Sequence, residues 1–164
     1  MERLWAPWRL AYIQQDKGTQ DGCVFCVPES TDEDRQRLIL HRGKHAFVVM
    51  NRFPYNNGHL LVTPYRHTAD PGVLSDAETL EMQHLLVLCR DVLQECMAPN
   101  GFNIGLNLGQ AAGAGIADHL HLHIVPRWNG DTNFMPVFSE VRVIPQHLEA
   151  GFECLNASFA RRRQ

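Results

Sequence analysis

The chain has 164 residues, of which 45% are hydrophobic, so it is long enough for a single globular domain with one core. Its 15 basic and 18 acidic residues give a formal net charge of -3, which excludes a strongly basic surface for binding nucleic acid polymers. Because no apolar run is long enough to span a membrane and the N-terminal segment lacks the apolar stretch of a signal peptide, we expect a cytoplasmic protein without a membrane partner.

The N-terminal half predicts two antiparallel strands followed by a long helix. Residues 38–53 and 59–65 are β-prone runs, and the turn-forming sequence PYNNG separates them. At Ser75 the sequence SDAE matches a capping box, in which a serine and a glutamate at a helix start bind each other's backbone N–H groups. Apolar residues then recur at helical spacing until PNG at 99–101, so we expect one long helix between these points.

The second half predicts two further strands joined by a glycine-rich loop. Residues 102–109 alternate between apolar residues on one face and Asn103, Gly105 and Asn107 on the other. The segment GQAAGAGIAD follows, and its small residues allow the backbone to approach a ligand closely. In HLHLHIV, the leucines and the isoleucine are expected in the core, and the three histidines share the opposite face.

The C-terminal residues predict one more strand and a helix. The sequence VRVI at 141–144 is typical of a short strand, and Pro145 ends it. Four large apolar residues then recur at helical spacing: Leu148, Phe152, Leu155 and Phe159. This pattern predicts an amphipathic helix despite Gly151.

Three histidines at alternate positions distinguish the sequence DHLHLHIVPRW, residues 118–128. Same-face neighbours on a strand lie about 6.6 Å apart, so the imidazoles form a row in which adjacent rings can do different work. A single histidine on a sheet is usually only a hydrogen-bonded residue. Three in strict alternation beside a glycine-rich loop indicate a functional site instead.

Two kinds of chemistry fit this row. Two histidines at i and i+2 can bind zinc or iron if another ligand completes the site, but Asp118 adjoins His119 and is expected to point to the other face. Alternatively, a neutral imidazole attacks a phosphorus or acyl centre and forms a covalent intermediate. The amides of the glycine-rich loop and Arg127 would then stabilise phosphate oxygens.

Of the five cysteines, only Cys23 and Cys26 are spaced to share a ligand. They are either half of a zinc site, a redox pair or two ordinary cysteines. Cys89, Cys96 and Cys154 lie in helix-like stretches, where they are expected to serve as small apolar side chains.

These segments together resemble the histidine-triad (HIT) superfamily. HLHLHIV is similar to its motif of three histidines with hydrophobic residues between them, and the likeness extends through CVFC, NRFPYNNGHLLVTPYRH, GFNIGLNLGQAAGAG and PRWNGDTNFMPV. It covers about residues 5–144, and it is greatest for the bacterial branch assigned as diadenosine tetraphosphate phosphorylases. The resemblance implies an α+β fold, with an antiparallel sheet, one long helix, a C-terminal helix and a sheet continued across a homodimer. It also implies one domain, with an N-terminal extension (1–22), a core (23–144) and a C-terminal helix or tail (145–164).

The resemblance implies roles for two of the three histidines. His121 would attack the α-phosphorus of a nucleotide and form a nucleotidyl-histidine, with a backbone carbonyl holding its far nitrogen, and His123 would assist the leaving group. The implied activity is cleavage of adenine dinucleoside polyphosphates, with phosphate or water as the acceptor. The alternatives are a nucleoside phosphoramidate or adenylylated adduct as substrate, and a nucleotide-binding interaction module with incidental turnover.

The resemblance also implies one structural zinc ion per chain and no organic cofactor. The implied ligands are Cys23, Cys26, His67 and His119. His41 or His45 would replace His67 if the alignment is displaced.

Further residues are implied to contact the nucleotide. The full set is Asn51, His59, Asn107, Ala114, Gly115, Arg127 and Trp128. Asn51 would hold the ribose hydroxyls, and the amides of Ala114 and Gly115 would replace a side-chain donor that many relatives carry before the triad. Trp128 would either stack near the second half of a dinucleotide, across a subunit boundary, or simply pack within the fold.

Overall fold

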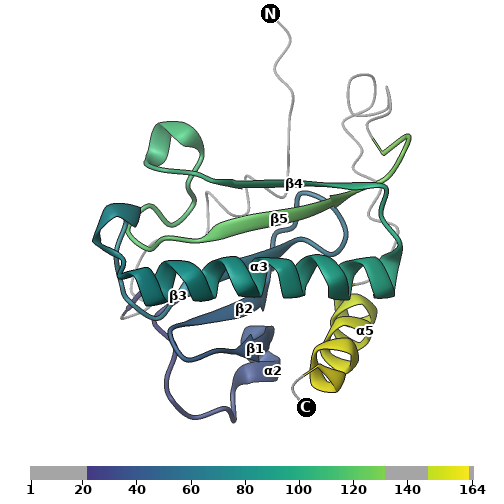
Figure 1. The fold of residues 1–164 in the computed structure, drawn as a ribbon, viewed down its shortest axis with the longest axis horizontal. Coiled ribbons are helices and arrows are strands. Elements are labelled where there is room, and N and C mark those ends of the chain that lie inside the picture. The colour runs from purple at the N-terminus through teal and green to yellow at the C-terminus, as the bar shows by residue number, and fades with distance from the viewer. Residues whose placement is uncertain (1–21, 132–147, 163–164) are drawn as a thin grey trace, which may run out of the picture.

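The computed structural model describes residues 22–131 and 148–162, and a five-stranded antiparallel sheet lies at its centre (Figure 1). The strands are β1 (Ile39–Arg42), β2 (Ala46–Met50), β3 (Leu60–Pro64), β4 (Gly101–Leu106) and β5 (Leu122–Arg127), in the order β1-β2-β3-β5-β4. The helices are α2 (Asp34–Arg37), α3 (Asp76–Met97) and α5 (Leu148–Arg161), with 3₁₀ turns η1 (Pro71–Val73) and η2 (Gln110–Ala112). The predicted α+β fold is confirmed. The predicted N-terminal extension and the predicted strand at 141–144 lie outside the described residues, residue 22 excepted.

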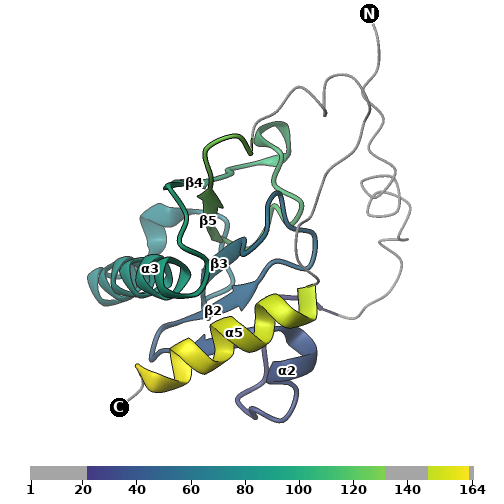
Figure 2. The same ribbon diagram turned by 90° about the vertical axis from the view of Figure 1, so that its right-hand side faces the viewer.

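Both long helices cover one face of the sheet. Figure 1 shows α3 running across the sheet with α5 beside its C-terminal end, and Figure 2, which looks along α3, shows this helix on one side of the strands. The core between them contains Leu40, Val48, Leu60, Val62, Leu122 and Ile124 from the sheet, Met82, Leu85, Cys89, Val92 and Leu93 from α3, and Phe152, Leu155 and Phe159 from α5. Both predicted helices therefore bury the apolar stripe that indicated them. Among the described helices, none has the length and apolar character needed to cross a bilayer.

The long helix begins at the predicted capping box. The Ser75 hydroxyl accepts a hydrogen bond from the Glu78 N–H (3.3 Å), and the Glu78 carboxylate accepts one from the Ser75 N–H (2.8 Å). A hydrogen bond from Arg66 to Glu78 is the main reason that the pKa of Glu78 is lowered to about 2. The helix ends where Ala98 adopts the left-handed conformation, with φ of 45°, just before PNG.

The first β-prone run forms two strands rather than one. β1 and β2 pair antiparallel around a turn at residues 43–45, and β2 pairs with β3 as predicted. Glu81 of α3 holds this turn, because its carboxylate accepts hydrogen bonds from the backbone N–H groups of Lys44 (2.8 Å), His45 and Ala46 (2.9 Å). The contact joins residues far apart in the chain, so the local sequence gives no sign of it.

Glu81→Ala is expected to lower the free energy of unfolding by about 2 kcal/mol, because three backbone N–H groups lose their acceptor. Glu81→Gln keeps one acceptor oxygen, so its free energy of unfolding is expected to fall clearly less. Urea denaturation of both variants measures the difference. Equal stability of Glu81→Ala and the unchanged chain would show that the turn does not depend on this carboxylate.

The opposite face of the sheet carries a second, smaller apolar cluster. Its buried members are Phe25, Ile39, Phe47, Val49 and Leu61. Arg42 anchors the segment that contains Phe25: it donates hydrogen bonds to the carbonyl oxygens of Pro28 (2.9 Å) and Ser30 (3.1 Å) and forms an ion pair with Asp34. The two N-terminal cysteines are thereby held on the face away from α3.

In the described part of the chain, β4 is an edge strand. The predicted alternation holds, because Asn103 and Gly105 stand opposite Val125 and His123 of β5. The apolar side chains of β4 are nevertheless poorly covered: Ile104 is 51% exposed and Leu106 is 37% exposed. This edge of the sheet therefore presents apolar side chains to the outside.

Candidate active site and metal centre

The histidine row lies on the sheet face away from α3, but only its last member belongs to β5. β5 begins one residue after His121, so His119 and His121 lie in the irregular segment that leads into it, not in a strand as predicted. Pro64 ends β3 opposite this segment and has no N–H for another ladder bond. The Thr63 hydroxyl instead donates to the carbonyl of Leu120 (3.0 Å), which holds the segment beside β3.

His121 is held in one tautomer. It is only 7% exposed, and its Nδ1–H donates a hydrogen bond to the carbonyl oxygen of His119 (2.8 Å). Nε2 therefore keeps its lone pair in the neutral ring. Burial lowers the pKa of His121, although this hydrogen bond opposes the shift, so the ring stays neutral at about pH 7. The Phe25 ring packs against it at 5.1 Å between centroids and restricts its orientation.

A chain of hydrogen bonds fixes the tautomer of His123. The amide of Asn51 (3.2 Å) and the backbone N–H of Tyr55 (3.1 Å) both donate to Nδ1 of His59, so Nδ1 is an acceptor. The proton of the neutral His59 ring is then on Nε2, which donates to Nδ1 of His123 (2.9 Å). His123 consequently carries its proton on Nε2. This buried atom has no hydrogen-bond partner among the described residues, so it is a donor available to a ligand.

The pKa of His123 leads to a prediction about stability. Burial, with a smaller effect from His121, lowers the pKa of His123 to about 4, whereas a histidine in an unfolded chain titrates near 6.5. As the pH falls below about 6.5, the unfolded chain takes up this proton and the native protein does not. The free energy of unfolding is therefore expected to drop by about 2 kcal/mol between about pH 7 and about pH 5 from this group.

Urea denaturation of the unchanged chain and of His123→Gln at these two pH values isolates the contribution, because both proteins share every other titrating group. The variant is expected to lose less stability on acidification. The same loss in both proteins would contradict the lowered pKa.

A pocket of about 210 Å³ opens beside His123. It is lined by Tyr55, Asn103, Ile104, Gly105, Asn107, His123 and Val125. A Cβ atom at Gly105 would meet nothing within 4 Å, so this glycine leaves open the space next to the imidazole. On another side, the Tyr55 ring stacks on His123 with 5.8 Å between centroids and 17° between planes.

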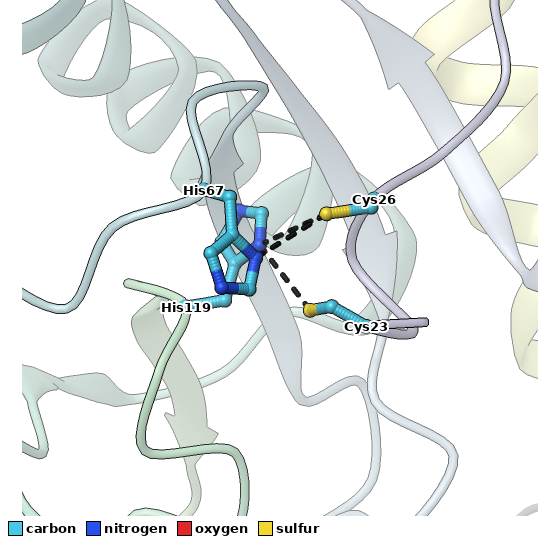
Figure 3. Close-up of side chains that lie close together, drawn as sticks. All are labelled: Cys23, Cys26, His67 and His119. Carbon is cyan, nitrogen blue, oxygen red and sulfur yellow. Dashed lines mark hydrogen bonds between the residues drawn. The ribbon is translucent and has the colours of Figure 1, made fainter. Parts of the chain in front are cut away.

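Two cysteines and two histidines from three separate segments form a compact group (Figure 3). Its members are Cys23, Cys26, His67 and His119, and their ligand atoms all lie within 4.8 Å of one another. Sγ of Cys23 is 3.3 Å from Nδ1 of His119, and Sγ of Cys26 is 3.3 Å from Nδ1 of His67 and 3.9 Å from Nδ1 of His119. The four predicted ligands therefore meet, and His67 rather than His41 or His45 completes the group.

The geometry of this Cys/His group fits a tetrahedral metal ion. Zinc bonds to sulfur and nitrogen at a tetrahedral site place neighbouring ligand atoms about 3.6 Å apart, close to the three sulfur–nitrogen separations of 3.3, 3.3 and 3.9 Å. His119 donates from Nε2 to the carbonyl of Pro64 (2.8 Å), so its Nδ1 carries a lone pair toward the sulfur atoms. Burial lowers the pKa of His119, which favours the neutral form that a metal requires.

Two of the predicted nucleotide contacts are bound within the protein. Arg127 forms an ion pair with Asp131 (2.7 Å) and donates to the amide oxygen of Asn103 (2.6 Å). The indole N–H of Trp128 donates to the carbonyl of Met97 at the end of α3 (3.2 Å), which indicates a packing role. Both residues thus support neighbouring elements.

The other predicted contacts are divided between the pocket and the loop after β4. Asn107 lines the pocket, and Asn51 reaches it indirectly through His59. Ala114 and Gly115 are not among the described residues that line it. The Ala114 N–H donates to Gly109 within its own loop (3.4 Å), and Gly115 is exposed.

Sequence reasoning missed Tyr55 and Phe25. Tyr55 was part of a turn-forming sequence and Phe25 stood between two cysteines, and neither pattern separates an aromatic residue at a site from one used for packing. Their ring contacts with His123 and His121 come only from the fold.

Comparisons with known proteins agree with this architecture. AP-4-A phosphorylase from Mycobacterium tuberculosis is 37% identical over 169 residues, which cover 98% of this chain and 86% of that protein. A Zn-bound histidine triad family protein from Mycobacterium smegmatis superposes with a TM-score of 0.64 at 24% identity, covering 87% of this chain and 96% of that one. Diadenosine triphosphate hydrolase from Plasmodium falciparum gives a TM-score of 0.59 at 20% identity and covers 78% of each chain.

The structural likenesses show a shared fold, and the sequence likeness extends along almost the whole chain. The family model described as HIT domain matches residues 32–130, which include the histidine row, the pocket and two members of the Cys/His group. The resemblance predicted from the sequence is thereby confirmed, and the chain belongs to the HIT domain family.

Proposed function

We propose that the chain cleaves adenine dinucleoside polyphosphates at the α-phosphorus, through a nucleotidyl group carried by His121. The observation that carries this proposal is the hydrogen bond from Nδ1 of His121 to the carbonyl of His119, because it leaves Nε2 as the nucleophilic nitrogen. The 37% identical relative named AP-4-A phosphorylase supports the class of substrate.

The reaction consists of two displacements at one phosphorus atom. Nε2 of His121 forms a P–N bond while the P–O bond to the leaving nucleotide breaks; the oxygen keeps the electron pair and accepts a hydrogen bond from the Nε2–H of His123. In the second step, an oxygen of phosphate or water attacks on the side that the first group left, and any proton on that oxygen passes to the solvent. The P–N bond breaks, and its electron pair returns to His121. Phosphate as acceptor gives ADP, and water gives AMP.

We also propose one structural zinc ion per chain, bound by the Cys/His group. When bound, zinc would supply rigidity rather than Lewis acidity to substrate, because four protein ligands complete its tetrahedral sphere. The M. smegmatis protein, which is described as Zn-bound, supports this choice of metal. His119 links the metal site to the reaction, since its carbonyl oxygen holds His121.

The proposed nucleotide contacts follow the same geometry. Asn51 has a second amide N–H beyond the one directed at His59, and it is proposed to bind a ribose hydroxyl. Asn107 is proposed to contact the phosphates from the pocket wall. The backbone amide of Gly115, and that of Ala114 in place of its bond to Gly109, are proposed to do so from the loop after η2. No organic cofactor takes part.

A homodimer with a continuous sheet is also proposed. Within the described residues, β4 is the edge next to β5, and the exposed side chains of Ile104, Leu106 and Leu108 extend along it. Leu106→Lys is expected to shift the protein to monomer, because a charge at a paired edge strand disfavours strand addition. Analytical ultracentrifugation measures this. Val73→Lys, at a site 53% exposed in η1, is the control and should leave the assembly unchanged. A monomeric unchanged chain would contradict the dimer.

The experiment that tests the function is product analysis of diadenosine tetraphosphate by chromatography, with and without inorganic phosphate. Cleavage at the α-phosphorus predicts ADP as the new product when phosphate is present, and AMP with ATP when it is absent. Turnover of an adenosine phosphoramidate without any turnover of the dinucleotide would instead favour the alternative substrate class. A chain that binds both compounds and cleaves neither would be a binding module.

A further inference from the structure

The two cysteines of the Cys/His group form a dithiol as well as half of a metal site. A backbone hydrogen bond from the Cys26 N–H to the Cys23 carbonyl (3.0 Å) closes a tight turn between them. Such a turn brings its first and fourth Cα atoms within about 7 Å, which is the range in which a disulfide can form. The two sulfur atoms lie within 4.8 Å of each other, on the same side of the turn (Figure 3). A disulfide can therefore close with little movement of the backbone.

The Cys/His group is exposed on one side and buried on the other. Cys26 and His67 are exposed, whereas His119 is only 1% exposed. A thiol that binds a metal is a thiolate, which is also the form of cysteine that oxidants attack. A small oxidant in solution can thus reach the Cys26 sulfur without entering the active site.

The buried side of the group contacts the proposed nucleophile. The Phe25 ring, which belongs to the cysteine turn, packs against His119 (5.6 Å between centroids) and against His121 (5.1 Å). The carbonyl of His119 accepts the hydrogen bond that fixes His121. Because the metal would join the turn to His119, its loss is expected to loosen both contacts and to disturb the orientation of His121.

We propose that the Cys23–Cys26 dithiol is an oxidation site, through which hydrogen peroxide releases the zinc ion and stops cleavage. This inference rests on the proposed function, including its zinc ion. The Cys26 thiolate attacks one peroxide oxygen, the O–O bond breaks, and hydroxide leaves a sulfenic acid. The Cys23 thiolate then attacks this sulfur, the S–S bond forms, and the S–O bond breaks with loss of a second hydroxide. Two protons convert the hydroxides to water, so one peroxide is reduced for each disulfide formed.

The oxidised turn no longer provides a complete metal site. A disulfide carries no thiolate charge, so only His67 and His119 remain as ligands, and two imidazoles hold zinc far more weakly than the full set. The chain after the turn stays attached, since Arg42 donates hydrogen bonds to the carbonyl oxygens of Pro28 and Ser30. A thiol reductant together with zinc is therefore expected to restore the original state.

Treatment of the zinc-loaded protein with hydrogen peroxide tests the proposal. The expected result is the release of about one zinc ion per chain, measured with a chromogenic chelator, and a Cys23–Cys26 disulfide in the peptide map. Cleavage of diadenosine tetraphosphate is expected to fall at least about tenfold, and dithiothreitol with zinc should restore it. Zinc that stays bound, or that leaves without formation of this disulfide, would overturn the inference.

Cys26→His separates metal binding from oxidation. The imidazole of the variant can replace the exposed thiolate as fourth ligand, because zinc accepts nitrogen and sulfur ligands alike. The single thiol that remains in the group cannot close the disulfide. The variant is therefore expected to retain its zinc at a peroxide concentration that empties the unchanged chain. Release at the same rate from both proteins would contradict the role of the dithiol.

Cys96→Ser is the matched control. Cys96 is a half-buried cysteine outside the Cys/His group, so the variant should lose zinc and activity in peroxide as the unchanged chain does. Each activity is compared with that of the same protein before treatment. Protection by Cys96→Ser would place the oxidation elsewhere and would overturn the inference.

The failures of the two proposals are distinguishable. If the unchanged chain binds zinc and cleaves the dinucleotide but keeps its metal in peroxide, the oxidation site alone is wrong. If it binds no zinc, the proposed metal site is wrong as well. If it binds zinc and cleaves nothing, the proposed cleavage is wrong, and zinc release with the peptide map still decides on the oxidation site.

Discussion

His121→Ala is expected to lower kcat for diadenosine tetraphosphate by a factor of about 10⁴ or more. Among the described residues, neither histidine beside His121 is placed to replace the nucleophile: Nδ1 of His119 points into the Cys/His group, and Nε2 of His123 carries a proton. Loss of a nucleophile removes the covalent route altogether, which accounts for an effect of this size. Steady-state kinetics measures the loss, and mass spectrometry after acid-free quenching should find the adenylyl group on the unchanged chain alone.

The variant should keep its fold, because the chain neighbours of His121, Leu120 and Leu122, belong to the main core on the opposite face of the sheet. His84→Ala is the control: this histidine is exposed on α3 and should retain full activity. A His121→Ala protein that cleaves the dinucleotide at the original rate would rule out the covalent mechanism. Slow residual cleavage without an adenylyl intermediate would agree with direct attack by water, assisted by the remaining groups.

Much of the fold could be predicted from local patterns. The capping box at Ser75 and the apolar stripe of α3 are short-range signals, and both are realised as expected. The alternation in β4 and β5 likewise puts Gly105 and His123 on one face. Such signals succeed because helix and strand periodicity follow from which side of an element is buried.

The parts that escaped prediction depend on contacts between distant segments. The turn between β1 and β2 is held by Glu81 from another element, and the start of β5 follows from a proline at the end of β3. Neither partner is recognisable from its own surroundings in the sequence. The observed strand boundaries therefore differ from the predicted ones, although every described strand overlaps a predicted run.

The same distinction applies to the site. The ligand group was predicted from a resemblance, and the structure brings its four members together. The tautomers of His121 and His123 could not be predicted, because each depends on a hydrogen bond to an atom that only the folded chain supplies. For Arg127, whose charge suggested phosphate, nothing in the sequence indicated the ion pair with an acidic residue four positions later.

Removing the metal is expected to have the largest effect on stability. Elemental analysis should find about one zinc ion per chain, and Cys23→Ser should lose most of it. The free energy of unfolding is then expected to fall by about 3 to 5 kcal/mol, because metal binding to the native state is coupled to folding. The loss should be accompanied by reduced activity, since the segment with Phe25 packs on His121 and His119 supplies the carbonyl that holds it. Metal analysis and urea denaturation of the same samples measure both effects.

Cys96→Ser is the matched control for this prediction. Cys96 is also a half-buried cysteine, and its Sγ donates a weak hydrogen bond to the carbonyl of Cys154 (3.3 Å), which a serine can retain. It should keep the zinc and nearly all of the stability. His121→Ala should keep the zinc as well, because His121 provides no ligand atom to the Cys/His group. If His121→Ala lost the metal and Cys23→Ser kept it, His121 would be a metal ligand. The histidine row would then be a catalytic metal site, and the proposal of a nucleophile beside a structural zinc ion would be wrong.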